Sequence, residues 1–200
     1  GTWAAIDPEA AGFDPPGLAA IADFHAANES AWPRSMYLPG GAYAGTHFIG
    51  DSPPHDTPIG PVRPRGGPAG LLLRGGRVAG RWGDIDRADM AFSVAKSFLG
   101  VLAGLAAERG LIRSLDDPMA AYALDDGFNS PHNAAITWRQ MLQQTSEWEG
   151  TLWGKPDTLD RNRQVGPGET SGSKGEARPL QKPGTVWEYN DVRVNRLSLS

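Results

Sequence analysis

The sequence contains no cysteine, and this absence excludes disulfide bonds, thiolate catalysis and metal sites built from cysteine. No uncharged run approaches the roughly 20 residues that a helix needs to span a bilayer. Positive charge is not in excess either, because the formal net charge is −4. The charge therefore gives no electrostatic reason to expect binding to nucleic acid or to an anionic membrane. We expect a soluble protein without nucleic-acid or membrane partners, and the sequence leaves cytoplasm and periplasm equally open.

Several catalytic and binding motifs are also missing. The sequence has no G-x-S-x-G elbow, so the triad of an α/β-hydrolase has no anchor. It has no H-E-x-x-H zinc motif and no glycine loop of the kind that binds phosphate. Within residues 31–68 no pair of histidines has a helical or hairpin spacing that suits a metal ion. We therefore expect neither a metal nor a cofactor.

What the sequence does contain is typical of a globular protein, with 40% hydrophobic and 21% charged residues. Its 26 glycines and 17 prolines exceed average usage and predict long irregular connections. Two such connections are residues 31–68 and 154–182. Between and around them the sequence predicts a helix capped by Asp14, a hairpin that turns at Gly75-Gly76, a helix capped by Thr137, and a last helix capped by Asn190 or Asp191. His25, on the first helix, is expected to be a packed histidine.

One stretch, residues 92–110, stands out as a helix that ends at Gly110. Its apolar residues fall on every face, which predicts a helix that is buried all round. Lys96 lies within it, and the eleven residues 97–107 that follow carry no charge. Burial lowers the pKa of a lysine, and Ser93 lies one turn away on the same face. A serine hydroxyl beside a lysine that can lose its proton is an activated nucleophile.

The spacing S-x-x-K alone also allows a simpler interpretation. Ser93 is then only the helix N-cap, and Lys96 is a first-turn residue whose side chain extends into solvent. A second S-x-x-K, from Ser171 to Lys174, shows how common the pattern is. That copy lies in a glycine-rich polar stretch, so we interpret it as a loop.

Four segments, taken in order, resemble the class C β-lactamase-related serine hydrolases. This group includes D-alanyl-D-alanine carboxypeptidases, β-lactamase-like carboxylesterases and 6-aminohexanoate oligomer hydrolases, many of them bacterial. The resemblance covers roughly residues 14–30 and 69–200. The segments are Ala91–Phe98, Leu115–Pro118, Ile136–Ser146 and Pro183–Tyr189. Two departures are Glu147, where the family usually has glycine, and Asp191, where β-lactamases usually have asparagine.

The resemblance implies roles for individual residues. Ser93 is the implied nucleophile, and Lys96 and Tyr189 together form the implied general base, with the tyrosine phenolate favoured by the lysine cation. Asp191 stands at a substrate-contacting position, although a helix cap is the simpler interpretation. The Ser93 backbone N–H is an implied oxyanion donor. The expected substrates are small esters or amides; a β-lactamase, a D-Ala-D-Ala carboxypeptidase and a non-hydrolysing penicillin-binding sensor remain alternatives.

Tryptophans near these motifs suggest an apolar pocket for the substrate, but they suit the core of a helical lobe equally well. They are Trp148, Trp153 and Trp187.

The implied fold is that of β-lactamases and penicillin-binding proteins, an α/β part with an antiparallel sheet flanked by helices, plus an all-α lobe. Residues 1–113 are expected to form the first part of the α/β domain, and residues 114–200 the helical lobe. In the family a later strand carries a third motif and the second oxyanion donor, and nothing before Ser200 matches it. We therefore expect these 200 residues to be an N-terminal half with an incomplete sheet, completed by further sequence or by a second chain.

Overall fold

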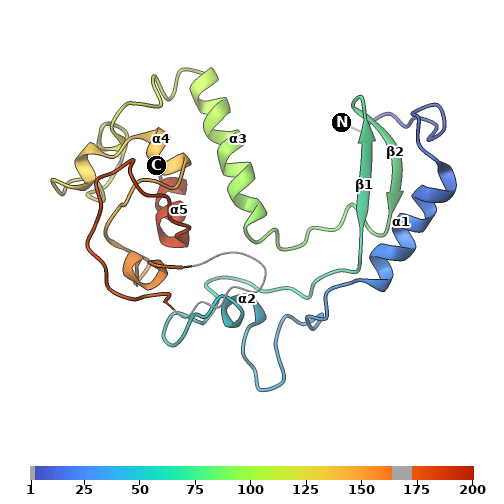
Figure 1. Cartoon of the computed structure of the whole chain (residues 1–200), viewed down its shortest axis with the longest axis horizontal. Helices are drawn as coiled ribbons and strands as arrows, with labels where there is room; N and C mark the ends of the chain where they lie inside the picture. The colour runs from blue at the N-terminus through green and yellow to red at the C-terminus, as the bar shows by residue number, and fades with distance from the viewer. Residues whose placement is uncertain (1–2, 164–172) are drawn as a thin grey trace. The chain divides into compact units, whose positions relative to one another are not determined.

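The computed structural model describes residues 3–163 and 173–200, and the chain divides into two units, Gly1–Met90 and Ala91–Ser200 (Figure 1). The division lies between Met90 and Ala91, whereas the sequence suggested a boundary after residue 113. The helix that carries Ser93 therefore belongs to the second unit, together with the segments that follow it.

In the first unit, a helix and a hairpin form as the sequence predicts. Helix α1, Pro15–Ala27, is capped by the Asp14 side chain, which accepts a 2.9 Å hydrogen bond from the Gly17 N–H. Strands β1, Gly70–Arg74, and β2, Arg77–Trp82, pair antiparallel. The turn between them has φ angles of 55° at Gly75 and 74° at Gly76, in the left-handed region that glycine tolerates best.

Other parts of the first unit extend this hairpin. Ala5 pairs with Val78 as a parallel bridge along β2. The Trp82 indole N–H donates a 3.0 Å hydrogen bond to His25 Nδ1 on α1, which confirms His25 as a packed residue. Residues 31–68 hold a separate small cluster in which Met36 is buried, next to helix α2, Ala44–His47. These contacts order the first unit without bringing catalytic motifs into it.

In the second unit, helix α3 spans Val94–Glu108 and is followed by Gly110, whose φ is 73°. The prediction that this helix is buried all round is wrong: Ala103 is its one buried residue. Four of its apolar side chains are at least 60% exposed, namely Val94, Phe98, Val101 and Leu102. The helix is apolar on every face, but the core of its own unit packs against only one of them.

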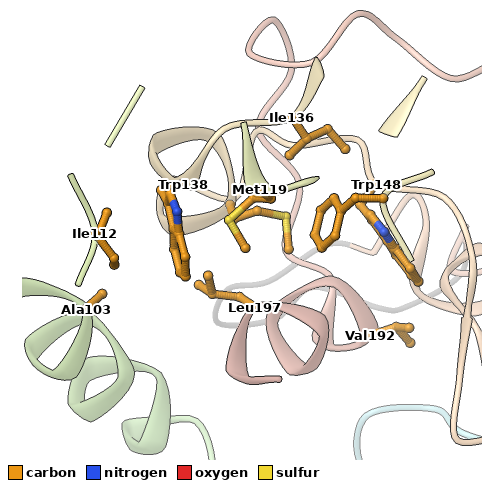
Figure 2. Packing of buried hydrophobic residues seen from close by; sticks show 10 residues of the cluster. Ala103, Ile112, Met119, Ile136, Trp138, Trp148, Val192 and Leu197 are labelled. Atoms are coloured by element: carbon orange, nitrogen blue, oxygen red, sulfur yellow. The ribbon is translucent and has the colours of Figure 1, made fainter. Parts of the chain in front are cut away.

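The core of the second unit lies where the short elements after α3 meet helix α5, Asp191–Ser198 (Figure 2). These elements are the 3-10 helices η1, Met119–Ala121, and η2, Asn133–Ala135, and helix α4, Trp138–Leu142. The predicted capping box at Thr137 is present: the Thr137 side chain accepts a hydrogen bond from the Gln140 N–H, and the Gln140 side chain accepts one from the Thr137 N–H. Fully buried side chains at the centre include Met119, Phe128 and Ile136.

The sequence did not predict the small elements within residues 154–182 and just before them. Strands β3, Thr151–Leu152, and β4, Lys155–Pro156, form a short hairpin that leads into the 3-10 helix η3, Asp157–Asp160. In the described part of the chain the sheets are therefore two, each of two antiparallel strands. None of the described helices combines the length and the apolar character needed to cross a membrane.

Candidate active site

Ser93 is the residue just before helix α3, at its N-cap position. Its hydroxyl makes no capping hydrogen bond, so the simpler interpretation of Ser93 as a side-chain cap does not hold. The preceding residue, Phe92, has a φ of 46°, a left-handed conformation that is strained for a bulky side chain. This backbone turn sets Ser93 at an exposed point of the chain.

Two further predicted residues meet at the Ser93 hydroxyl. The Tyr189 hydroxyl donates a hydrogen bond of 2.6 Å to Ser93 Oγ, and the Lys96 ammonium donates one of 3.0 Å. Lys96 reaches Ser93 because the two residues are three apart on one helix face. The structure thus brings the three implied catalytic side chains together around one oxygen.

Tyr189 is held in place by the end of helix α4. The segment before it is hydrogen-bonded to the turn after α4, with Gly184 N–H donating to the Thr145 carbonyl at 2.7 Å. Glu188 N–H donates to the Gln144 carbonyl at 3.1 Å in the same turn. Two segments that resemble family motifs, Ile136–Ser146 and Pro183–Tyr189, are therefore joined through their backbones.

Asp191 is the main electrostatic partner of Lys96. Its Oδ1 lies 2.7 Å from Lys96 Nζ. Burial works to lower the pKa of Lys96, but the Asp191 carboxylate outweighs it, and the net shift is upward. Burial therefore acts on this lysine in the expected direction, but the expected net lowering of its pKa is wrong, because nothing in the sequence indicated the paired carboxylate. The ion pair with Asp191 therefore favours the charged form of Lys96.

Asp191 does not cap its helix. Asn190 does so, because its side chain accepts from the Arg193 N–H at 3.2 Å. Asp191 is the first residue of α5, and its second oxygen, Oδ2, lies 2.6 Å from Arg163 Nη1. Burial works to raise the Asp191 pKa, yet Lys96 and Arg163 together lower it. Both oxygens of the predicted substrate contact are thus engaged by side chains of the protein itself.

Arg163 is a site residue that the sequence analysis missed. It lies in an irregular segment, 28 residues before its partner Asp191, and belongs to no motif. Its guanidinium carbon is 4.8 Å from the centre of the Tyr189 ring, and Lys96 Nζ is also 4.8 Å from that centre. Two cations therefore contact the ring of the tyrosine whose hydroxyl faces Ser93.

Glu147, which replaces the usual glycine of the resembling family, is fully buried. Its φ of 52° lies in the left-handed region, so the backbone keeps a conformation that glycine favours. Arg178 approaches its carboxylate with two nitrogens, each at 2.6 Å, and Arg193 with one at 2.8 Å. Burial raises its pKa, but these two arginines and the Gln181 N–H outweigh it, and the pKa falls to about 2.

This buried carboxylate belongs to a larger cluster beneath Tyr189. Arg193, on α5, also contacts Glu188 at 3.0 Å and Asp157 at 3.1 Å. The neighbour of Tyr189 along the chain is therefore held by the same arginine that holds Glu147. The cluster fixes the start of α5 and, with it, the positions of Tyr189 and Asp191.

The three tryptophans suggested for the pocket lie apart. Trp148 is 2% exposed, and its indole N–H donates to the Gly127 carbonyl at 2.7 Å, which places it in the core. Trp153 and Trp187 are 60% and 55% exposed. None of the three tryptophans borders the hollow beside Lys96 that is described below.

The second S-x-x-K falls partly outside the described residues, since Ser171 is not among them. Its lysine, Lys174, is described, and its side chain is 5% exposed beside Asp160, with 3.3 Å between Nζ and Oδ1. Burial of this lysine was not expected from its polar surroundings. An ion pair with a buried carboxylate explains it.

A hollow of about 200 Å³ opens beside Lys96, between α3, α4 and α5. On α3 it is bordered by Lys96, Ser97 and Gly100, which share the face of Ser93 because they follow it at three, four and seven residues. Its remaining walls are mainly apolar and comprise Leu99, Met141, Leu142, Gln144, Val194 and Leu197. A Cβ added at Gly100 would meet no atom within 4 Å, so the hollow is open at that point.

The described residues include no group of three or more histidine, aspartate or glutamate side chains arranged to hold a metal ion. In comparisons with known proteins, the family model described as Beta-lactamase matches residues 73–198. No curated protein and no solved structure matches the chain.

Proposed function

The chain belongs to the Beta-lactamase family, whose members are in general serine hydrolases, and on that premise we propose that it hydrolyses small esters or amides through an acyl-enzyme. One observation carries the proposal. The oxygen of Ser93 accepts hydrogen bonds from both Tyr189 and Lys96, at 2.6 and 3.0 Å. This places the hydroxyl of a nucleophile within proton-transfer distance of a tyrosine and beside a cation.

In the proposed acylation, Tyr189 takes the proton of the Ser93 hydroxyl after losing its own. The Ser93 oxygen bonds to the carbonyl carbon of the substrate, and the bond from that carbon to the leaving oxygen or nitrogen breaks. Tyr189 passes its proton to the leaving group, which departs as the alcohol or amine. Water then attacks the acyl carbon, gives a proton to Tyr189 and releases the acid, and Ser93 recovers its proton.

Lys96 acts in this scheme as a cation rather than as the base. Its ion pair with Asp191 keeps it protonated, since the net shift of its pKa is upward. From that position it favours negative charge on Tyr189 and on Ser93 in turn. Ser93 also directs its own N–H from the start of α3, where backbone donors lack helical partners, and we propose this N–H as one oxyanion donor.

The hollow beside Lys96 is our proposed site for the acyl group. It lies along the same face of α3 as Ser93, and the helical rise from Ser93 to Gly100 is roughly 10 Å. A straight acyl chain of about six carbons spans most of that length, and apolar walls favour its burial. We therefore base the expectation of an apolar acyl group on the hollow beside Lys96 and not on the three tryptophans.

The test is turnover of p-nitrophenyl acetate, butyrate and hexanoate by the intact protein, alongside a chromogenic cephalosporin. Catalytic release of p-nitrophenol with little cephalosporin hydrolysis supports the proposal. Rapid cephalosporin hydrolysis favours a β-lactamase instead. A stoichiometric adduct without turnover favours a penicillin-binding sensor. If the protein forms no adduct and shows no turnover, the proposal is contradicted.

A further inference from the structure

Asp191 is shared by two cations that reach it from different parts of the chain. Lys96, on α3, lies at 2.7 Å from one carboxylate oxygen, and Arg163 lies at 2.6 Å from the other. The Arg163 side chain is only 9% exposed, which is unusual for an arginine unless it is paired. Both cations also lie 4.8 Å from the centre of the Tyr189 ring.

The charges of this group decide what Tyr189 and Ser93 experience. If Asp191 faced Lys96 alone, the pair would carry no net charge, and little positive potential would remain at the Ser93 hydroxyl. With Arg163 on the other oxygen, two positive charges oppose one negative charge, which leaves a net charge of +1. A nearby positive charge favours the deprotonated form of a hydroxyl.

We propose that Arg163 is a positioning residue for the proposed reaction: it shares Asp191 with Lys96, so that one net positive charge remains beside Tyr189 and Ser93. The proposal rests on the proposed function of these two residues. Arg163 acts through Asp191 and the Tyr189 ring, and it does not touch the Ser93 oxygen.

Other charged groups near Asp191 and Tyr189 form ion pairs of their own. Buried Asp160 accepts the Asp191 N–H at 3.1 Å, and its other oxygen faces Lys174 at 3.3 Å and Lys155 at 3.6 Å. Glu188, next to Tyr189, pairs with Arg178 at 2.8 Å and with Arg193 at 3.0 Å.

The two cations that contact the Tyr189 ring are Lys96 and Arg163, and Asp191 is the carboxylate that they share. Asp191 also raises the pKa of Arg163 against the effect of burial, so the guanidinium stays charged at every pH at which the enzyme is assayed.

The experiment is a double-mutant cycle of Arg163→Gln, Asp191→Asn and the double variant in the intact protein. Counting Lys96, Asp191 and Arg163, the net charge is +1 in the natural protein, 0 in Arg163→Gln, +2 in Asp191→Asn and +1 in the double variant. Two rates are followed from pH 5 to pH 10: covalent labelling of Ser93 by a fluorophosphonate, and kcat/KM for a p-nitrophenyl ester. Thermal unfolding of each variant confirms that it is folded.

The acidic limb of each profile is the low-pH range over which the rate rises with pH. We expect Arg163→Gln to shift this limb to higher pH by about one unit in both profiles. Asp191→Asn should shift it to lower pH. The double variant should return the limb most of the way to that of the natural protein. Arg163→Lys, which keeps the charge, should move it less than Arg163→Gln. Arg139→Gln is the matched control, since it removes one arginine from a surface pair with Asp116 in the same unit and should leave the limb in place.

An unchanged limb in Arg163→Gln would overturn the proposal. So would a double variant that is shifted as far as Arg163→Gln, because Arg163 would then serve packing and not charge balance. If Arg163→Gln does not fold, the direction of the shift in Asp191→Asn decides, and a shift to higher pH contradicts the proposal. Failure of the proposed function looks different, since the natural protein would then neither label at Ser93 nor turn over any ester.

Discussion

The hydroxyl of Tyr189 donates a 2.6 Å hydrogen bond to Ser93 Oγ, although 96 residues separate the two along the chain. Nothing local in the sequence forces this contact. It arises because the turn after α4 holds the segment before Tyr189 through two backbone hydrogen bonds. The same arrangement places Asp191 against Lys96, and this ion pair changes the role that we assign to the lysine.

Lys96→Arg and Lys96→Gln separate a fixed cation from a proton carrier. Arginine keeps the charge but does not lose its proton in proteins. If Lys96 acts only as a cation, Lys96→Arg should keep measurable activity, whereas Lys96→Gln should lose about 10²–10³-fold in kcat, as when one group that stabilises transition-state charge is removed. The measurement is steady-state ester hydrolysis at pH 8.

Equal loss in the two Lys96 variants would contradict this account and would make the lysine a partner in proton transfer. Labelling of Ser93 by a fluorophosphonate should follow the same order as kcat. KM should change less than kcat, because the chemical step is affected rather than binding.

Gly100→Leu tests the proposed acyl site. Gly100 borders the hollow beside Lys96, and a Cβ at this position meets no atom within 4 Å, so we expect the leucine side chain to fill part of the hollow. We expect the ratio of kcat/KM for the hexanoate ester to that for the acetate ester to fall by about tenfold or more, since each methylene in such a pocket changes specificity by about 10–200-fold.

Gly104→Leu is the matched control for the acyl site, because it adds the same side chain to α3 at a residue that does not border the hollow. It should leave the ester ratio unchanged. Gly100→Ala should be well folded and more stable by roughly 0.5–1 kcal/mol, as expected for alanine in place of glycine within a helix. If Gly100→Leu and the natural protein had equal ester ratios, the proposed acyl site would be contradicted.

Glu147→Gln should destabilise the fold by on the order of 3 kcal/mol, the cost of breaking a buried ion pair on one side. It leaves Arg178 and Arg193 without the carboxylate that both contact. The measurement is urea unfolding at pH 7. Glu176→Gln, an exposed glutamate in the same unit, is the control and should change the free energy of unfolding little. A change as small as that of the control would contradict a structural role for the cluster.

The same carboxylate predicts a dependence of stability on pH. The Glu147 pKa is lowered from 4.5 to about 2 in the folded protein. A carboxyl with a lowered pKa stabilises the fold above its ordinary value, and this contribution is lost as the pH falls through the folded value. The contribution of Glu147 to the free energy of unfolding should therefore decline between about pH 4.5 and pH 2. The free energy of unfolding should change less with pH across that range in Glu147→Gln than in the natural protein. An identical dependence on pH in the two proteins would exclude this carboxylate as the cause.

Much of the local structure could be predicted from the sequence because short-range chemistry determines it. The Asp14 cap, the Gly75-Gly76 turn and the Thr137 capping box all form as expected. Ser93 and Lys96 share a helix face, as their spacing requires. Their meeting with Tyr189 followed from the family resemblance, and the match of the Beta-lactamase family model to residues 73–198 confirms that resemblance.

The features that the sequence did not predict depend on distant partners. The direction of the Lys96 pKa shift required knowing that Asp191 lies 2.7 Å away, across 95 residues of sequence. Arg163 carries no motif, so only its contact with Asp191 reveals it. The exposure of α3 was also hidden, because an apolar sequence indicates which faces are able to pack and not which of them find a partner.

The most direct test of the central claim is the mass of the protein during turnover. The intact protein, mixed with p-nitrophenyl hexanoate and quenched in acid within seconds, should gain the mass of one hexanoyl group, and peptide mapping should place it on Ser93. Ser93→Ala should gain no mass and release no p-nitrophenol above the uncatalysed rate. Hydrolysis by Ser93→Ala at the rate of the natural protein, or an acyl group mapped to another residue, would contradict the assignment of Ser93 as the nucleophile.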